Sequence, residues 1–403
     1  MVNKVNRKTP CFLLTLVLLP LLLTGCWDRI EVNDIAFVLG SSIDKENGLI
    51  RSTVQIALPS QLGGAGSEGG GGGTSGSKTF LMLSKTAPTV YTANKEMQTS
   101  LSRVLNYSHR RVTLYGEEFA RTGIGEQIDT FARFPQNRLT TYIVVTRGPA
   151  YKVLGADAPI EQVPAEMIRE IAKSGMKSAM SVQKLSNQLL TEGIDPAIPA
   201  VTLGESAPDK VGDGQSLVRL DGLGVLRTDK LVGFLDTDDG AMALLAMNEA
   251  IDPKVSVRYE GGNPDQMITV SLNETNSKIR TRLKNSQIVA DIYIQAKGLL
   301  VENTSNVNLE STMMGKLEKQ CNDFVAERVR EVANKVLKEY RSDIFGIGNS
   351  FHNAYPAEWA KVHNRWNDVL PEVEVRVHSH VHLENTGELI NSLGVREDRL
   401  RND

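Results

Sequence analysis

Three histidines near the C-terminus have a spacing that could bind a metal ion. His378, His380 and His382 occupy alternate positions of the segment 373–383, where valine or leucine fills most of the intervening positions. Alternate side chains of a strand share one face, and imidazole is a common zinc ligand. The same face is equally typical of the solvated side of a sheet, and only Glu374 and Glu384 lie near enough in sequence to support the ligands. We therefore predict no specific metal site and keep the three histidines as weak candidates.

Other patterns that could bind an ion or a nucleotide are weaker still. The acids in Asp236-Thr-Asp-Asp-Gly240 resemble a calcium loop, but an apolar segment follows where the loop would need oxygen ligands, so capping of a helix explains them better. The pattern G-x-G-x-x-G at 71–76 lies inside a glycine run that generates such matches by chance. The sequence has no G-x-S-x-G, H-E-x-x-H, C-x-x-C or Walker pattern. We predict a protein that is not an enzyme and has no cofactor.

The first 26 residues have the features of a bacterial secretion signal. Three basic residues lie between positions 4 and 8, and the apolar segment 12–23 is shorter than the roughly 20 residues that a membrane span prefers. Leu23-Thr-Gly-Cys26 then resembles a lipobox, in which the peptide is cut before an acylated cysteine. We predict that residues 1–25 are a lipoprotein signal peptide and that Cys26 becomes the lipid-bearing N-terminus. The alternatives are an ordinary signal peptide with a chance cysteine, or an uncleaved anchor.

The composition narrows the class of protein. The 403 residues include 45 Lys and Arg against 48 Asp and Glu, so nucleic-acid binding through bulk positive charge is excluded. Hydrophobic residues make up 41% and charged residues 23%, which is too apolar for a disordered chain and too polar for a protein with many membrane spans. Three cysteines are too few for a disulfide scaffold. At this length a single core is rare, which predicts two or three domains.

The elements that position these residues begin with a mixed α/β region over 26–204. Strands are expected at 34–40, 51–58, 79–83, 111–115 and 140–146, and helices at 86–104, 124–133, 164–174 and 181–190. The segment 117–122 is expected to lead into the second of these helices. The first two strands are expected to form a hairpin. The segment 63–76 is mostly glycine and lacks large hydrophobic residues, which predicts a flexible surface loop.

A boundary between two regions is expected at the polar segment 204–216, which follows Pro196 and Pro199. The second region, 217–403, is expected to contain strands at 217–226, 231–235, 255–259, 267–272 and 287–295, and a helix at 239–249. It could subdivide near residue 252 into a small middle domain and a C-terminal domain.

The C-terminal part of this region has the clearest periodicity. Apolar residues step by three and four from Leu317 to Tyr340, which predicts a long helix over 315–341 with Cys321 on its core face. The alternation at 373–383 predicts a half-solvated strand. Together the elements predict an α+β (mixed α/β) fold in which helices cover mixed sheets.

A segment rich in glycine and large apolar residues separates the long helix from the final strand. In Asp343-Ile-Phe-Gly-Ile-Gly348 the two glycines permit a tight turn. Trp359 and Trp366 are seven residues apart, so a helix begun near Pro356 would place both on one face. That face either closes the C-terminal core or forms an exposed docking surface for a partner, and we favour the core.

Four well-spaced segments resemble a known family. They are Cys26-Trp-Asp-Arg-Ile-Glu-Val-Asn-Asp34, Asn106-Tyr-Ser-His-Arg-Arg-Val-Thr-Leu-Tyr-Gly-Glu-Glu-Phe-Ala-Arg121, Asp221-Gly-Leu-Gly-Val-Leu-Arg-Thr-Asp-Lys-Leu-Val-Gly233, and Asp343 to Gly348 with Pro356, Trp359 and Trp366. In this order they resemble the Ger(x)C family, the lipoprotein C-subunits of nutrient germinant receptors in endospore-forming bacteria. The glycine stretch at 63–76 departs from the tidier loop expected of the family.

The resemblance implies a non-enzymatic subunit of a spore germinant receptor with three mixed α/β domains. It would be anchored through acylated Cys26 on the outer face of the inner spore membrane. Its partners would be two integral-membrane subunits, one of them a transporter-like protein that senses the nutrient. Two other classes remain as alternatives: a solute-binding lipoprotein of an importer, and a cell-envelope hydrolase, for which the residues offer no catalytic constellation.

Overall fold

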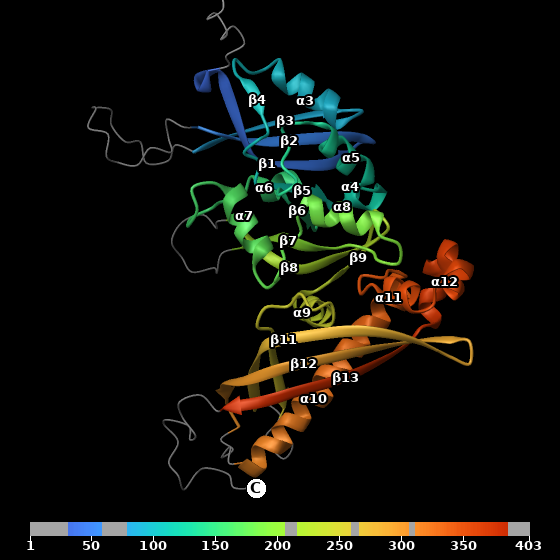
Figure 1. Cartoon of the computed structure of the whole chain (residues 1–403). Helices are drawn as coiled ribbons and strands as arrows, with labels where there is room; N and C mark the ends of the chain where they lie inside the picture. The colour runs from blue at the N-terminus through green and yellow to red at the C-terminus, as the bar shows by residue number, and fades with distance from the viewer. Residues whose placement is uncertain (1–30, 59–78, 206–215, 259–265, 306–310, 386–403) are drawn as a thin grey trace, which may run out of the picture.

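Two mixed sheets with helices packed against them make up the protein (Figure 1). The computed structural model describes residues 31–58, 79–205, 216–258, 266–305 and 311–385. The arrangement confirms the α+β class. The expected signal peptide at 1–25, Cys26 and the glycine-rich segment 63–76 lie outside the described residues.

The first sheet begins with the expected hairpin. Strands β1 (Ile35–Glu46) and β2 (Leu49–Ala57) pair antiparallel, and Asn47 and Gly48 form the turn with φ angles of 49° and 81°. Both central residues of this turn have positive φ, which is the geometry that matches strand twist in two-residue hairpins. Because the turn begins at Asn47, β1 runs to Glu46, well beyond the expected end at residue 40.

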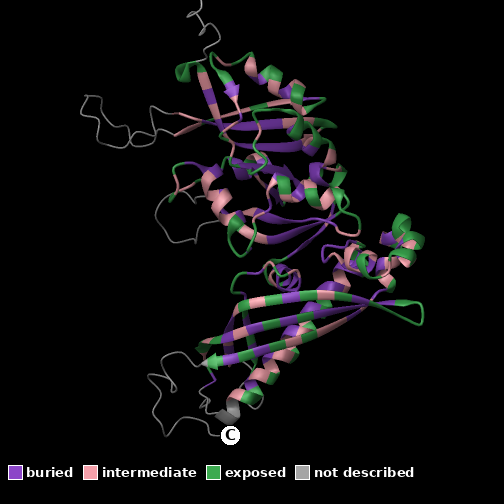
Figure 2. Ribbon diagram, viewed as in Figure 1, coloured by how far each residue is buried: buried purple, intermediate pink, exposed green. Residues whose placement is uncertain are grey.

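The centre of the first sheet is parallel and both of its flanks are antiparallel. The strand order is β3-β2-β1-β5-β6-β7-β8-β9, with β4 pairing with the start of β1. The remaining strands are β3 (Phe80–Ala87), β4 (Val104–Asn106), β5 (Val112–Gly116), β6 (Tyr142–Thr146), β7 (Ala197–Glu205), β8 (Ser216–Arg227) and β9 (Lys230–Leu235). Its helices are α3 (Val90–Gln98), α4 (Glu117–Thr122), α5 (Gly125–Arg133), α6 (Ala150–Leu154), α7 (Pro164–Lys173) and α8 (Val182–Leu190). The central strands are buried on both faces, as expected for parallel strands covered by helices (Figure 2).

The expected helix over 86–104 is wrong at both ends. The helix is only α3, because the Thr89 hydroxyl accepts a hydrogen bond from the Thr92 N–H at 3.1 Å and so caps its start. Residues before the cap belong to β3, and residues 104–106 form β4. Apolar spacing alone did not mark these limits, because valine and leucine serve strands as well as helices.

Strand β7 was missed, because Pro196, just before it, and Pro199, inside it, indicated a break. Pro199 lies inside β7, at a bulge where the register to β8 shifts between Pro199 and Val201. A bulge is one of the few sheet positions that tolerate a proline. β8 and β9 then complete the first sheet, although their residues belong to the region 217–403. The division of the chain at 204–217 stays a prediction, and the first sheet extends across it.

The second sheet has the order β10-β11-β12-β13 and starts just after residue 252. Its strands are β10 (Lys254–Arg258), β11 (Met267–Lys284), β12 (Gln287–Asn303) and β13 (Glu374–Asn385). Its helical segments are α9 (Thr237–Ala246), α10 (Ser311–Asn334), the π-helical turn η2 (Lys335–Tyr340), α11 (Ile347–Ala354), α12 (Pro356–Val362), the 3-10 turn η3 (His363–Arg365), α13 (Trp366–Val369) and the 3-10 turn η4 (Leu370–Glu372). The expected long helix and final strand are confirmed. β11 is much longer than expected, because its second half is polar and is held by its ladder to β12.

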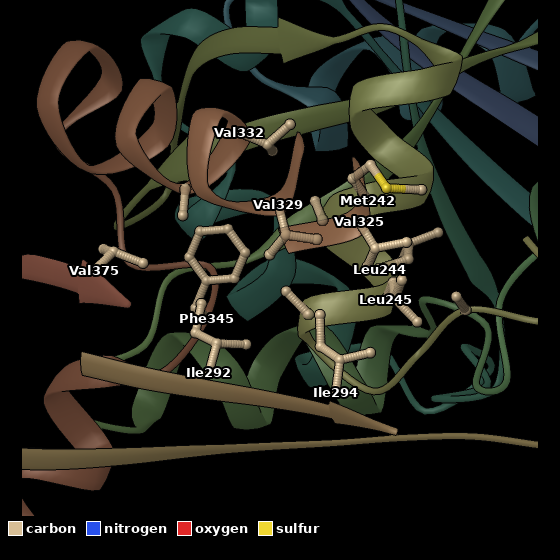
Figure 3. Packing of buried hydrophobic residues seen from close by; sticks show 14 of the residues in the cluster. Met242, Leu244, Leu245, Ile292, Ile294, Val325, Val329, Val332, Phe345 and Val375 are labelled. Carbon is tan, nitrogen blue, oxygen red and sulfur yellow. The ribbon is translucent and has the colours of Figure 1, made fainter. Parts of the chain in front are cut away.

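One large core joins α10 to the second sheet. Val325, Val329 and Val332 on α10 face Ile292 and Ile294 on β12 (Figure 3). The same cluster includes Met242, Leu244 and Leu245 of α9 and Phe345. Cys321 is fully buried in this core, and burial raises the pKa of its thiol to about 12, as expected for a structural cysteine.

Candidate functional site

The candidate functional site is the junction between the two sheets, where the loop 192–195 contacts the segment 341–348. The loop follows α8 and leads into β7, and the segment follows the π-helical turn η2. The Asp195 N–H donates to the Asp343 carbonyl at 2.8 Å, and the Asn349 N–H donates to the Gly193 carbonyl at 3.0 Å. The junction therefore holds two segments together that are about 150 residues apart in the sequence.

The carboxylate of Asp343 is the centre of the junction. Its two oxygens accept hydrogen bonds from the Ile347 N–H at 2.8 Å, the Gly348 N–H at 2.7 Å and the Trp366 Nε1–H at 2.9 Å. Asp195 completes the network, because its carboxylate accepts from the Asp343 N–H at 2.8 Å and the Thr228 N–H at 2.6 Å. Buried acceptors are stable only when donors satisfy them, and here backbone and indole donors do so.

Burial perturbs both acids in the same direction. Asp343 has no exposed surface, and its burial raises the pKa of its carboxyl to about 7. The nearby Asp195 charge adds to this rise, while the three N–H donors oppose it. Burial likewise raises the pKa of Asp195 above its ordinary value. A solvent-borne substrate does not reach a fully buried carboxyl, so the chemistry of this site is structural: it holds one sheet against the other.

The two tryptophans are buried beside this network, as the core interpretation predicts. Trp359 is 3% exposed and Trp366 is 6% exposed, and their rings meet edge to face at 5.1 Å. The expected continuous helix is wrong, because α12 ends at Val362 and η3 separates it from α13. The Trp359 Nε1–H donates to Glu192 at 3.1 Å, so it too contacts the loop of the first sheet.

Three further contacts tie α10 and η2 to neighbouring elements. Asp239, at the start of α9, accepts from Arg328 at 2.8 Å and from Lys335 at 2.9 Å. The N-cap of α9 is Asp236, whose carboxylate accepts from the Asp239 N–H, so these acids cap a helix as expected. The Tyr340 hydroxyl donates to the Phe234 carbonyl of β9 at 3.0 Å.

The three histidines remain on the exposed face of β13 but have different partners. His378 Nε2 lies 3.0 Å from an Asp291 oxygen, and its ring stacks on Tyr293. His382 Nδ1 lies 3.1 Å from a Glu318 oxygen, and His380 is exposed. Within the described part of the chain, no three His, Cys, Asp or Glu side chains are grouped so as to hold a metal ion.

Neither Asp195 nor Gly193 is among the candidate residues that the sequence predicts. An aspartate before a proline is too common to indicate a buried role. Gly193 is in the left-handed region with φ of 72° and lies directly against Gly348. The two glycines, where the two backbones come closest, were the sequence signal that could have indicated this contact. Only the fold shows that they meet.

We expect Gly193→Ala to destabilise the protein more than Gly175→Ala does. Both glycines have positive φ, so each alanine costs about 1–2 kcal/mol of backbone strain. A Cβ at Gly193 would also lie 2.4 Å from the Gly348 carbonyl carbon, whereas nothing lies within 4 Å of one at Gly175. The additional loss should be about 1–3 kcal/mol in urea unfolding. Equal losses in the two variants would show that the backbone contact carries no stability.

The fold and the junction together describe an α+β protein in which the hydrogen bonds of two buried aspartates, Asp195 and Asp343, hold two mixed sheets together. Comparison with known proteins gives the family. Residues 28–203 match the family described as spore germination protein N-terminal domain, and residues 221–387 match the family described as spore germination B3/GerAC like, C-terminal. The chain therefore belongs to the spore germination receptor C-subunit family, and the resemblance to Ger(x)C proteins is confirmed.

Individual relatives agree with this assignment. YfkR of Bacillus subtilis (strain 168), named as a spore germination protein, is 35% identical over 94% of this chain and 97% of its own. Spore germination protein B3 of the same organism is 23% identical over 88% of this chain and 92% of its own. The crystal structure of the GerBC protein has a similar fold, with a TM-score of 0.56 and 21% identity over 89% of this chain and all of that chain. Among the described residues, no helix is both long and apolar enough to cross a membrane.

Proposed function

We propose that this chain is the lipid-anchored C-subunit of a nutrient germinant receptor, tethered through Cys26 to the outer face of the inner spore membrane. The observation that carries the proposal is the order of features along the chain. A basic and apolar leader ends in Leu23-Thr-Gly-Cys26, and the family matches begin two residues later and continue almost to the end. A lipid on Cys26 would hold the whole ectodomain at one membrane surface, helped by protein contacts, since one acyl chain alone binds marginally.

The partners in this proposal are two integral-membrane subunits. Supporting it, the relatives of this chain include proteins named spore germination proteins KC, B3 and A3, and each alignment covers most of both chains. The proposed role is that of a non-catalytic subunit, because the Asp343 carboxylate at the junction is fully occupied by structural hydrogen bonds. The comparisons give no support to the importer alternative.

Cys26→Ala is expected to abolish incorporation of radiolabelled palmitate and to release the protein from the membrane fraction of sporulating cells. The thiol is the proposed acyl acceptor, and without it no tether remains. Cys11→Ala is the matched control, because it removes a cysteine inside the leader and should leave labelling unchanged. Undiminished labelling of the Cys26 variant would overturn the anchor.

Affinity purification from spore membranes tests the assembly. The proposal predicts that the tagged wild-type chain recovers two polytopic membrane proteins, identified by mass spectrometry, and that Cys26→Ala recovers much less of them. Recovery of an importer permease in their place would support the alternative class. Recovery of no membrane protein by the wild-type chain would contradict the proposed receptor assembly.

A further inference from the structure

A cavity of about 440 Å³ lies beside the first sheet. None of its lining residues belongs to the two segments of the junction. Its lining residues come from helices α3 and α5 and from strands β1, β4 and β5. Figure 1 labels these elements. Much of the wall is apolar, with Val90, Leu105, Phe131 and Phe134 among its residues. This volume is within the range of small-molecule sites, which combine apolar walls with a few polar groups.

Three buried polar atoms in residues of this wall have no hydrogen-bond partner within the described part of the chain. They are the Tyr107 hydroxyl, the Tyr115 hydroxyl and the Arg110 Nε. Tyr115 is fully buried and Tyr107 is 7% exposed. Eight side-chain atoms of the described residues are buried without a partner, and three of the eight belong to residues that line this one cavity. Buried polar groups are almost always satisfied, and an orphaned cluster indicates a missing partner.

The charge of Arg110 has no counter-ion among the residues that the structure describes. Its two terminal nitrogens donate to neutral oxygens, at 3.1 Å to Ser41 and at 2.7 Å to Asn137, and its guanidinium lies 4.1 Å over the Phe131 ring. Among the described residues, no acidic side chain lines the cavity, and the second cation of its wall, Lys95, is exposed. Burial lowers the pKa of Arg110 to about 10, so it stays charged at neutral pH. The Arg110 side chain is half-buried, and a charge partly removed from water without a counter-ion is costly, which favours an anionic ligand.

The phenols add to this preference. Burial raises the pKa of Tyr107 to about 12, so its hydroxyl is protonated at neutral pH and can donate a hydrogen bond. One guanidinium Nε–H and two phenol O–H groups are donors suited to one singly charged acceptor. A doubly charged phosphate would leave a buried negative charge uncompensated, whereas a carboxylate would not.

We propose that this cavity binds a small molecule with an apolar body and one carboxylate, which accepts hydrogen bonds from Arg110, Tyr107 and Tyr115. The apolar body occupies the space between α3 and α5. The segment Asn106 to Arg121, which the sequence analysis singled out, thereby supplies all three polar groups of the site. The proposal is independent of the receptor function proposed above.

The test is calorimetric titration of the full chain in detergent micelles with 4-phenylbutyrate, with heats of micelles alone subtracted. The neutral analogue 4-phenylbutan-1-ol has the same apolar body and no charge. The acid should bind at least roughly tenfold more tightly than the alcohol, because only the acid compensates Arg110. Arg110→Met should abolish this preference.

A second variant keeps the test decisive if Arg110→Met fails to fold. Tyr115→Phe removes only a hydroxyl that has no protein partner, so the thermal midpoint should not fall, while binding of the acid should weaken roughly fivefold to tenfold. Tyr151→Phe, on α6 outside this wall, is the matched control and should change neither quantity. Equal affinity for acid and alcohol, undiminished binding in Tyr115→Phe, or no binding of the acid at millimolar concentration would each overturn the proposal.

Discussion

Replacing Trp366 by alanine is expected to lower the free energy of unfolding by about 3–5 kcal/mol. The side chain is 6% exposed, and its ring stacks on Phe351 at 6.2 Å and meets Trp359 edge to face. Its indole N–H is also one of three donors to the buried Asp343 carboxylate. The substitution therefore leaves a cavity in the core and an acceptor with one donor fewer, and both effects act in the same direction.

Trp366→Phe separates these two effects. Phenylalanine keeps most of the packing but cannot donate to Asp343, so we expect a loss of about 1–2 kcal/mol. Urea unfolding of the fragment 27–403, followed by near-ultraviolet circular dichroism, measures both variants together with Trp359→Ala. Normal stability in both Trp359→Ala and Trp366→Ala would mean that the tryptophans do not anchor the core and would favour the docking surface.

Replacing Asp343 by alanine should have an effect of similar size. Three buried N–H groups would lose their acceptor, and each costs about 1–3 kcal/mol when it is left unsatisfied. Water does not enter easily, because Asp343 and its neighbours Ser342 and Ile347 have no exposed surface. We expect a loss of at least about 3 kcal/mol, measured by urea unfolding at pH 7.

Asp343 also makes stability depend on pH. Burial raises the folded-state pKa of this carboxyl from 3.8 to about 7, so between these values the folded chain holds a proton that the unfolded chain has released. Its contribution is fully present below about pH 4 and is lost as the pH rises through 7. The expected slope is roughly −1.4 kcal/mol per pH unit within that window.

Asp343→Asn isolates this slope. The asparagine does not titrate, so the difference in unfolding free energy between wild type and variant should shrink from pH 5 to pH 8. Asp368→Asn is the control, because this carboxylate is 73% exposed and its ion pair with Arg341 contributes little. A difference that does not change with pH would show that Asp343 is ionised throughout and that its three donors outweigh burial.

The local pattern of apolar residues was sufficient to predict the helices and strands that bury one face along their whole length. The three and four spacing from Leu317 to Tyr340 predicted α10, and the alternation before His378 predicted β13, because a helix or strand with one buried face repeats its apolar residues with its own period. The family followed from motifs that lie in the chain itself, and the matches over 28–203 and 221–387 agree with it.

Tertiary structure decided everything that depends on which distant segments meet. Pro196 and Pro199 concealed strand β7, in which a bulge accommodates Pro199, and the polar half of β11 is a strand only because β12 pairs with it. Nothing in the sequence places Asp195 against Asp343, or Tyr115 in one cavity wall with Arg110. Types and spacing of residues determine local conformation, whereas burial and the pKa of a buried acid are properties of the neighbours that folding brings to it.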